Sequence, residues 1–174
     1  MSCVVGRHSY VVPPFEENYG EQGQLIIGSF CSIAAGCRVF LGGNHLMKAI
    51  STYPFAAKNW KVPPCPDHPS SNGNIVIGND VWIGRHVTIM SGSTIGDGAV
   101  IGACSVVAGD IGDYELACGN PARMKKKRFS DEDIKLLKSL RWWNWPDEMI
   151  AEANPILMSG DVSRLAGFAR GNGL

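Results

Sequence analysis

The sequence predicts an all-β solenoid, a parallel β-helix, interrupted by one extruded loop and followed by a small C-terminal α-helical cap. Three observations support this fold class: a six-residue hydrophobic period, one long interruption of that period, and a change to helical spacing after Gly112. We expect a β-helix domain over residues 1–128, with the loop at about 42–74, and a helical extension over residues 129–174.

The six-residue period is the strongest of these signals. Aliphatic residues recur at every sixth position in a long tract and in a shorter upstream tract: Ile77, Ile83, Ile89, Ile95, Ile101 and Val107, and Ile27, Ile33 and Val39. Six residues turn an α-helix by about 600°, which spreads such positions over three faces and builds no apolar stripe. Six is a multiple of the two-residue period of a strand, so we expect each repeat to form one short strand and a corner.

A second set of small residues stands four positions after aliphatic residues of the repeat. The set is Cys31, Cys37, Val87, Ser93, Ala99 and Ser105. We expect both sets to point inward and to stack on their equivalents in neighbouring coils. Cys31 and Cys37 are then interpreted as small core residues.

The period is interrupted over roughly residues 42–74. Ile27 and Ile77 are 50 positions apart, which six does not divide, so the two tracts are out of phase. The interruption is rich in Pro, Ser and Asn, and about 30 residues is more than a compact domain usually spends on a connection. Its aromatic residues and histidines indicate a functional loop rather than a simple link.

Helical spacing replaces the six-residue period in the C-terminal part. Ser130 is suited to be the N-cap of an amphipathic helix that begins DEDIKLLKSL, with acidic residues in its first turn. Pro146 suits the start of a second helix. We expect the first helix to pack on the end of the β-helix, and the final GFARGNGL to be frayed.

Composition and charge exclude several classes of protein. The chain has 16 basic and 16 acidic residues, so no global field favours a nucleic acid or an anionic membrane. No apolar run approaches the ~20 residues of a membrane span, and MSCVVGRHSY lacks the apolar core of a signal peptide. The six cysteines form no CxxC pair and are too sparse for a disulfide scaffold. We therefore expect a protein of the reducing cytoplasm.

Four motifs together resemble one family. They are the NH…TYPF loop, NDVWIG, GNPA and WWNWP. The combination resembles the hexapeptide-repeat xenobiotic acetyltransferases, which include type-B chloramphenicol acetyltransferases and streptogramin (virginiamycin) acetyltransferases, over roughly residues 5–154. The resemblance implies a left-handed β-helix, a homotrimer with active sites between subunits, and acetyl-CoA as co-substrate for acetylation of a hydroxyl.

The resemblance assigns the catalytic role to His45. The pair Asn44-His45 stands at the start of the loop, where the family motif places its catalytic histidine. A hydroxyl is a poor nucleophile at neutral pH, and an imidazole accepts its proton as attack develops. His86 is expected on the surface, while His8 is open as a substrate contact and His68 as a residue of the pocket rim. No HxxxH or HxxxxH pair supports a metal site, so we expect no metal.

The same resemblance implies a groove for acetyl-CoA. Trp82 should point outward, because it stands next to an inward aliphatic residue, and it contacts either the thioester or a neighbouring subunit. Five of the six residues from Arg123 to Arg128 are basic, which suits the phosphates of CoA, although such a run is also typical of a solvated surface. The expected cofactor-binding residues are Trp82, Gly84, Gly102, Ala103, Asn120, Pro121, Lys125 and Lys126.

The acceptor pocket is expected to have an apolar and aromatic wall formed by Tyr10, Met47, Tyr53 and Phe55, unless these residues only anchor the loop.

Two alternative functions stay open. The segment VVPPFEENYGEQGQ before the repeats is shorter than in the family, which leaves room for an O-acetyltransferase of a sugar or polysaccharide. The other alternative is a non-catalytic trimeric scaffold.

Overall fold

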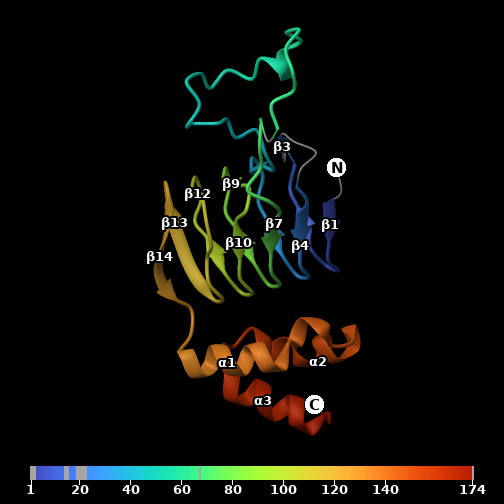
Figure 1. Cartoon of the computed structure of the whole chain (residues 1–174). Helices are drawn as coiled ribbons and strands as arrows, with labels where there is room; N and C mark the ends of the chain where they lie inside the picture. The colour runs from blue at the N-terminus through green and yellow to red at the C-terminus, as the bar shows by residue number, and fades with distance from the viewer. Residues whose placement is uncertain (1–2, 14–15, 19–22, 67, 174) are drawn as a thin grey trace. The chain divides into compact units, whose positions relative to one another are not determined.

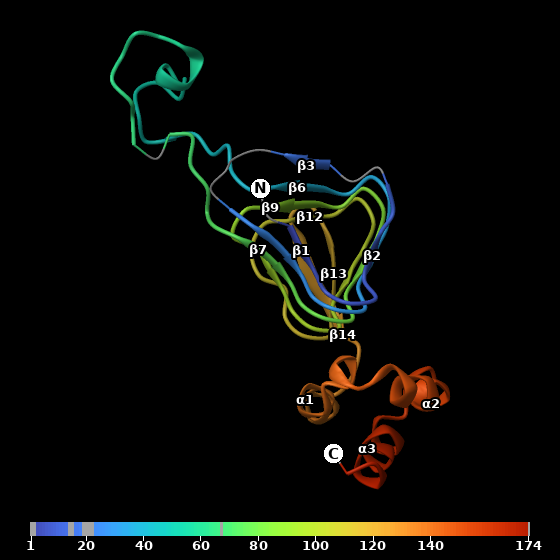
Figure 2. The same cartoon turned by 90° about the vertical axis from the view of Figure 1, so that its right-hand side faces the viewer.

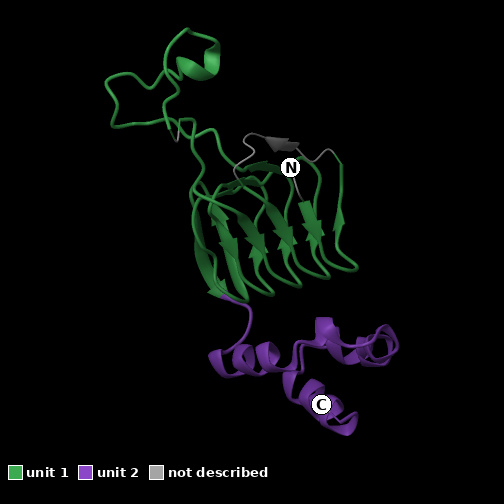
Figure 3. Cartoon of the chain, turned by 45° about the vertical axis from the view of Figure 1, so that its right-hand side comes forward, with its two compact units in different colours: residues 1–126 green, residues 127–174 purple. Residues whose placement is uncertain are grey.

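The computed structural model describes the whole chain except residues 1–2, 14–15, 19–22, 67 and 174. The chain divides into two compact units, residues 1–126 and 127–174, coloured green and purple in Figure 3. The first unit contains the stacked strands, and the second contains the helices.

The first unit is a parallel β-helix of three sheets, which we call sheets A, B and C (Figure 1). From β1 to β12, successive strands along the chain belong to successive sheets, so three strands complete one coil. Sheet A contains β1 (Cys3–Val5), β4 (Leu25–Ile27), β7 (Ile75–Ile77) and β10 (Thr94–Ile95). Sheet B contains β2 (Tyr10–Val11), β5 (Ser32–Ile33), β8 (Trp82–Ile83), β11 (Val100–Ile101), β13 (Glu115–Gly119) and β14 (Ala122–Lys127). Sheet C contains β3 (Glu16–Asn18), β6 (Arg38–Phe40), β9 (Thr88–Met90) and β12 (Val106–Val107).

The strand register stacks the aliphatic residues of the repeat directly on one another. Ile27 pairs with Ile77, and Ile77 pairs in turn with Ile95. Both expected inward sets are at most 2% exposed, which confirms the six-residue interpretation and the burial of Cys31 and Cys37. The pairing of Ile27 with Ile77 also shows that the intervening loop absorbs the phase difference between the two tracts.

A first coil precedes the expected repeats. Strands β1, β2 and β3 pair in parallel with β4, β5 and β6, so residues upstream of Leu25 continue the same stack. Val5 pairs with Ile27 but is 48% exposed, because it belongs to the terminal coil. Exposure at this end removed the strong aliphatic signal, so the six-residue period does not identify this coil.

Side chains tie the coils together at the corner between sheets A and B. The side chain of Asn79 accepts a hydrogen bond from the Ser29 N–H at 2.9 Å. The Asp97 carboxylate accepts from both the backbone and the side-chain nitrogen of Asn79 at 2.8 Å, and Asp113 accepts from the Asp97 N–H at 2.8 Å. This column satisfies backbone donors where the chain turns out of the sheets.

The second unit contains helices α1 (Asp131–Leu140), α2 (Asp147–Leu157) and α3 (Val162–Gly171). Ser130 is the N-cap of α1 and accepts a hydrogen bond from the Asp133 N–H at 3.1 Å, as expected. Pro146 occupies the N-cap position of α2, one residue before its first helical residue. No helix in the described part of the chain is long and apolar enough to cross a membrane.

The expectation of a frayed C-terminus is wrong. Helix α3 extends to Gly171 and packs against α1 and α2. Its buried residues follow one face of a helix: Val162, Leu165, Ala166 and Ala169. The glycines of GFARGNGL hid this face, because glycine weakens a helical pattern without preventing a helix held by packing.

Candidate active site

The chain leaves the stacked coils after β6 and returns to them at β7, so residues 41–74 form a loop at the corner between sheets C and A (Figure 2). The two arms of the loop are joined at its base. The Asn44 N–H donates to the Ser70 carbonyl at 2.9 Å, and the Ser70 N–H donates to the Asn44 carbonyl at 2.7 Å. The Ser71 hydroxyl also donates to the Leu41 carbonyl. This base brings the beginning and the end of the loop into contact.

His45 follows the base of the loop directly, and its ring is exposed. Its Nδ1 lies 2.6 Å from the carbonyl oxygen of Thr52. A carbonyl oxygen only accepts hydrogen bonds, so Nδ1 carries the proton. In the neutral ring the other nitrogen, Nε2, then has a free lone pair and can accept a proton from a substrate.

His68 reaches His45 from the other arm of the loop. The centroids of the two rings are 5.2 Å apart, and the rings are nearly perpendicular, at 72°. The Nε2 atom of His68 is buried and has no hydrogen-bond partner in the described structure. From the sequence, His68 is expected only as a candidate residue of the pocket rim. His45 and His68 are 23 positions apart, and only the pairing of Asn44 with Ser70 shows that the two histidines lie close together.

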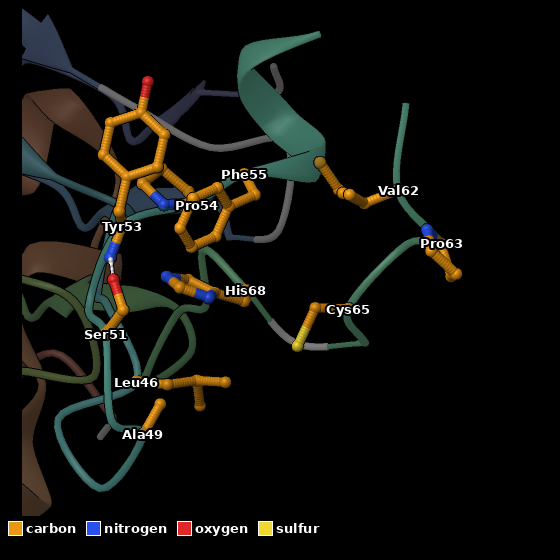
Figure 4. Close-up of a pocket in the computed structure, with 11 residues that line it drawn as sticks. Leu46, Ala49, Ser51, Tyr53, Pro54, Phe55, Val62, Pro63, Cys65 and His68 are labelled. Carbon is orange, nitrogen blue, oxygen red and sulfur yellow. Dashed lines mark hydrogen bonds between the residues drawn. The ribbon is translucent and has the colours of Figure 1, made fainter. Parts of the chain in front are cut away.

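A cavity of about 250 Å³ lies within the loop (Figure 4). Its lining comes entirely from loop residues: Leu46, Ala49, Ser51, Tyr53, Pro54, Phe55, Ala56, Val62, Pro63, Cys65 and His68. The rings of Tyr53 and Phe55 are 4.9 Å apart, and Trp60 extends the cluster at 5.2 Å from Phe55. The cavity is therefore mostly apolar, with Ser51, Cys65 and His68 among its few polar groups.

The four expected acceptor residues have different locations. Tyr53 and Phe55 line the cavity. Met47 belongs to the same loop but is 90% exposed and does not line it. Tyr10 lies on β2 in sheet B and is 57% exposed. The structure thus brings together two of the four, and it adds His68 to them.

The eight residues expected to bind acetyl-CoA all lie on sheet B or directly after one of its strands. Trp82 on β8 points outward and is 58% exposed, which confirms its expected orientation. The others follow β8, β11 and β13 or lie on β14: Gly84, Gly102, Ala103, Asn120, Pro121, Lys125 and Lys126. Because β8, β11 and β13 are parallel neighbours, the residues after them line one edge of the stack.

The glycines of this edge are required by the stacking itself. Gly84 is buried, and a Cβ atom there would lie 2.7 Å from the backbone nitrogen of Ala103 in the next coil. A Cβ atom at Gly102 would lie 2.8 Å from the Cβ of Cys118. Both distances are too short for a side chain, so close approach of the coils explains these glycines without a ligand.

The basic side chains on β14 are exposed. Within the part of the chain that the structure describes, Lys125 and Lys126 form no ion pair, whereas Lys127 is paired with Asp131. Two cations therefore remain available for an anion on this edge. Among the described residues, no three His, Cys, Asp or Glu side chains gather as a metal site requires.

His45 and the sheet B edge lie at different corners of the β-helix. The loop that carries His45 leaves from the corner between sheets C and A, whereas Gly84 and Ala103 lie at the corner between sheets B and C. Viewed along the stack in Figure 2, the loop leaves from one corner only. One chain alone therefore does not bring the two expected halves of the site to the same corner.

Comparison with known proteins identifies the family. The family model described as bacterial transferase hexapeptide (six repeats) matches residues 74–109. A chloramphenicol acetyltransferase of Agrobacterium fabrum is 43% identical over 192 residues, which cover 99% of this chain and 90% of the relative. A virginiamycin A acetyltransferase of Staphylococcus aureus is 42% identical over 178 residues, covering 94% and 80% of the two chains.

Solved structures agree with this result. The polySia specific acetyltransferase NeuO has a TM-score of 0.56 at 27% identity, over 75% of this chain and 56% of that chain, so this chain spans just over half of its length. A hexapeptide-repeat acetyltransferase of Vibrio cholerae, solved with acetyl coenzyme A, has a TM-score of 0.51 at 26% identity, over 72% and 71%. These neighbours imply the left-handed form of the β-helix. The chain belongs to the hexapeptide-repeat xenobiotic acetyltransferases and is an acyltransferase.

Proposed function

We propose that this protein transfers the acetyl group of acetyl-CoA to a hydroxyl of a small xenobiotic, such as chloramphenicol or a streptogramin. The observation that carries the proposal is the geometry of His45, whose Nδ1 is bound to the Thr52 carbonyl beside an apolar cavity. The names of the relatives support the class of acceptor, since they include chloramphenicol and virginiamycin A acetyltransferases.

The reaction is direct transfer within a ternary complex. His45 Nε2 removes the proton of the acceptor hydroxyl, and the oxygen attacks the thioester carbon. The C–O bond forms, the C–S bond breaks, and the proton passes from His45 to the departing CoA sulfur. No covalent enzyme intermediate is required.

The sheet B edge suits acetyl-CoA. Trp82 presents an exposed indole, and Ala103 is a small exposed residue beside Gly84 on the next coil, so an extended chain can lie along this edge. Lys125 and Lys126 supply positive charge for the phosphates of CoA. Asn120 and Pro121 connect β13 to β14, the strand that carries these lysines. Gly84 and Gly102 permit the close stacking on which this edge depends.

The active site is completed by a neighbouring subunit of a homotrimer. Support comes from the separation of His45 and the sheet B edge at two corners of one chain. A threefold assembly brings the loop corner of one subunit beside the CoA edge of the next. In this proposal the loop is extruded toward the neighbour, and the helices cap one end of the β-helix.

The domain boundary proposed from the sequence, between residues 128 and 129, stays a prediction. It is supported by the division of the chain into compact units after residue 126. A cytoplasmic location likewise stays a prediction from the cysteines.

A sugar is the less favoured acceptor. A galactoside O-acetyltransferase of Escherichia coli is 34% identical over 155 residues, so one relative of this chain is named for the acetylation of a sugar. Sugar sites need many hydrogen-bonding groups, whereas the cavity beside His45 is lined mainly by Leu46, Tyr53, Phe55 and Val62. An apolar acceptor fits this lining better.

The testing experiment measures CoA release with a thiol reagent in the presence of chloramphenicol, virginiamycin, galactosides and other sugars. A reaction without acceptor is subtracted, because the thiols of Cys3, Cys65 and Cys104 are exposed and also react. Turnover with an antibiotic supports the proposal. Turnover with sugars alone would show that the acceptor is a sugar rather than a xenobiotic. Saturable acetyl-CoA binding without any turnover would contradict the assignment of xenobiotic acetylation.

A further inference from the structure

His68 occupies a position that the mechanism above does not use. It lines the cavity, stands 5.2 Å from the ring of His45, and buries its Nε2 atom without a hydrogen-bond partner in the described structure. We propose that His68 is a specificity-determining residue, whose Nε2 binds a second polar group of the acceptor while His45 deprotonates the hydroxyl. This inference rests on the proposed acetylation of a hydroxyl at the same site.

The unpartnered nitrogen is the first argument. A buried polar atom without a hydrogen bond is costly, and native structures leave few such atoms. Replacing the imidazole by an apolar side chain would remove that cost, so a purely structural role does not explain a histidine here. An acceptor that places a hydrogen-bonding group in the cavity satisfies the atom.

The lining of the cavity is the second argument. Leu46, Phe55 and Val62 provide apolar contact, and polar groups are few. Figure 4 shows the His68 ring among the side chains that line the cavity. A single imidazole nitrogen in such surroundings fixes the orientation of a ligand, because small-molecule sites combine apolar walls with a few directed polar groups.

The distance between the two imidazoles defines the acceptor further. With ring centroids 5.2 Å apart, one molecule can reach both rings only through groups that are close together on it. The inferred acceptor is therefore an apolar molecule that carries, a few bonds from the acylated hydroxyl, a second hydrogen-bonding group such as an amide or another hydroxyl. A plain apolar alcohol lacks that second contact.

Two variants of His68 separate binding from packing. His68→Leu keeps apolar volume and removes the nitrogen, whereas His68→Gln retains a hydrogen-bonding group at the end of the side chain. His86→Asn is the matched control, because His86 is an exposed histidine at a coil corner and has a φ of 58°, which asparagine tolerates. Thermal unfolding of all three variants verifies that they are folded.

The probes are chloramphenicol, which has an amide and a second hydroxyl near its primary hydroxyl, and 4-nitrobenzyl alcohol, which has one hydroxyl and no such neighbour. We expect His68→Leu to raise KM for chloramphenicol about tenfold, the usual weight of one hydrogen bond in a buried site. KM for acetyl-CoA and the kinetics with 4-nitrobenzyl alcohol stay unchanged, and His68→Gln recovers part of the loss. His86→Asn behaves as the wild type.

Other results overturn the inference. An unchanged KM for chloramphenicol in His68→Leu shows that His68 does not contact the acceptor. Equal losses with both alcohols, or a lowered unfolding temperature with no recovery in His68→Gln, show that His68 only holds the loop. A wild type that acetylates no alcohol is a different failure, since it contradicts the proposed function itself and removes the basis of this inference.

Discussion

The hydrogen bond between His45 Nδ1 and the carbonyl of Thr52 decides which nitrogen of the ring can act as the base. The partner is a backbone atom, so its role does not depend on the side chain of Thr52. The ring is also exposed, which leaves it accessible to a substrate hydroxyl. A hydrogen bond to a residue seven positions away thus leaves Nε2 as the nitrogen of His45 that can act as the base.

Replacement of His45 tests this role. We expect His45→Ala to lower kcat by two or more decades, the range that general base catalysis usually contributes. The affinity for acetyl-CoA, measured by equilibrium binding, should stay nearly unchanged, because the proposed CoA contacts lie on sheet B. Full turnover in His45→Ala would rule out the assigned base.

Burial sets the reactivity of the cysteines. Cys31 and Cys37 are fully buried, and burial raises the pKa of both thiols above the ordinary 9.0 by disfavouring the thiolate. We expect a thiol reagent to label Cys3, Cys65 and Cys104 in the folded protein, and Cys31 and Cys37 only after unfolding, as measured by mass spectrometry. Rapid labelling of Cys31 under native conditions would contradict this.

The same two thiols give a pH dependence. A pKa raised in the folded state means that the protonated thiol is favoured there. The stability that this provides is fully present below pH 9.0, the value of an unshifted thiol, and is lost as the pH rises above it. Urea unfolding at pH 8 and pH 10 should therefore show a smaller fall in stability for Cys31→Val than for the wild type.

At the scale of elements, the column of Asn79, Asp97 and Asp113 holds successive coils at one corner. We expect Asp97→Ala to lower the free energy of unfolding by about 2 kcal/mol, because it leaves donors of Asn79 unpaired. Asp97→Asn retains an acceptor oxygen and should recover much of the loss in urea unfolding. If both variants match the wild type, the column does not stabilise the coils.

Elements with a strong inward pattern could be predicted from the sequence, and elements without one could not. The period from Ile77 to Val107 predicts the coils correctly because every sixth residue of this tract is at most 1% exposed and is therefore aliphatic. The first coil, with Val5 half exposed, carries less of this signal. The contact of His68 with His45 depends on the path of a loop, and no local spacing encodes that path.

At the scale of the whole molecule, the two halves of the proposed site lie at different corners of each chain. We expect His45→Ala and the double variant Lys125→Glu, Lys126→Glu each to have little activity alone. If the site is shared between subunits, a mixed assembly made by co-expression should regain about a quarter of the wild-type activity, the share of interfaces with both halves intact. Mixed trimers without any gain would place the whole site within one chain.

The pairing at the base of the loop predicts that the coils fold without the rest of the loop. Because Asn44 meets Ser70 and Ile27 pairs directly with Ile77, a short glycine linker in place of residues 45–69 should leave the strand register intact. We expect this variant to retain the far-ultraviolet circular dichroism of the parent and a cooperative thermal transition. Loss of the transition would show that the loop is part of the folding unit.

The origin of the cavity from one continuous stretch of chain has a consequence for how such enzymes diversify. Every residue that lines it lies between Leu46 and His68, and none belongs to the stacked core. Mutations that reshape the cavity therefore do not have to be balanced against the packing of the coils. Side chains of this stretch can therefore change, and with them the shape of the acceptor cavity, while the scaffold of stacked coils stays as it is.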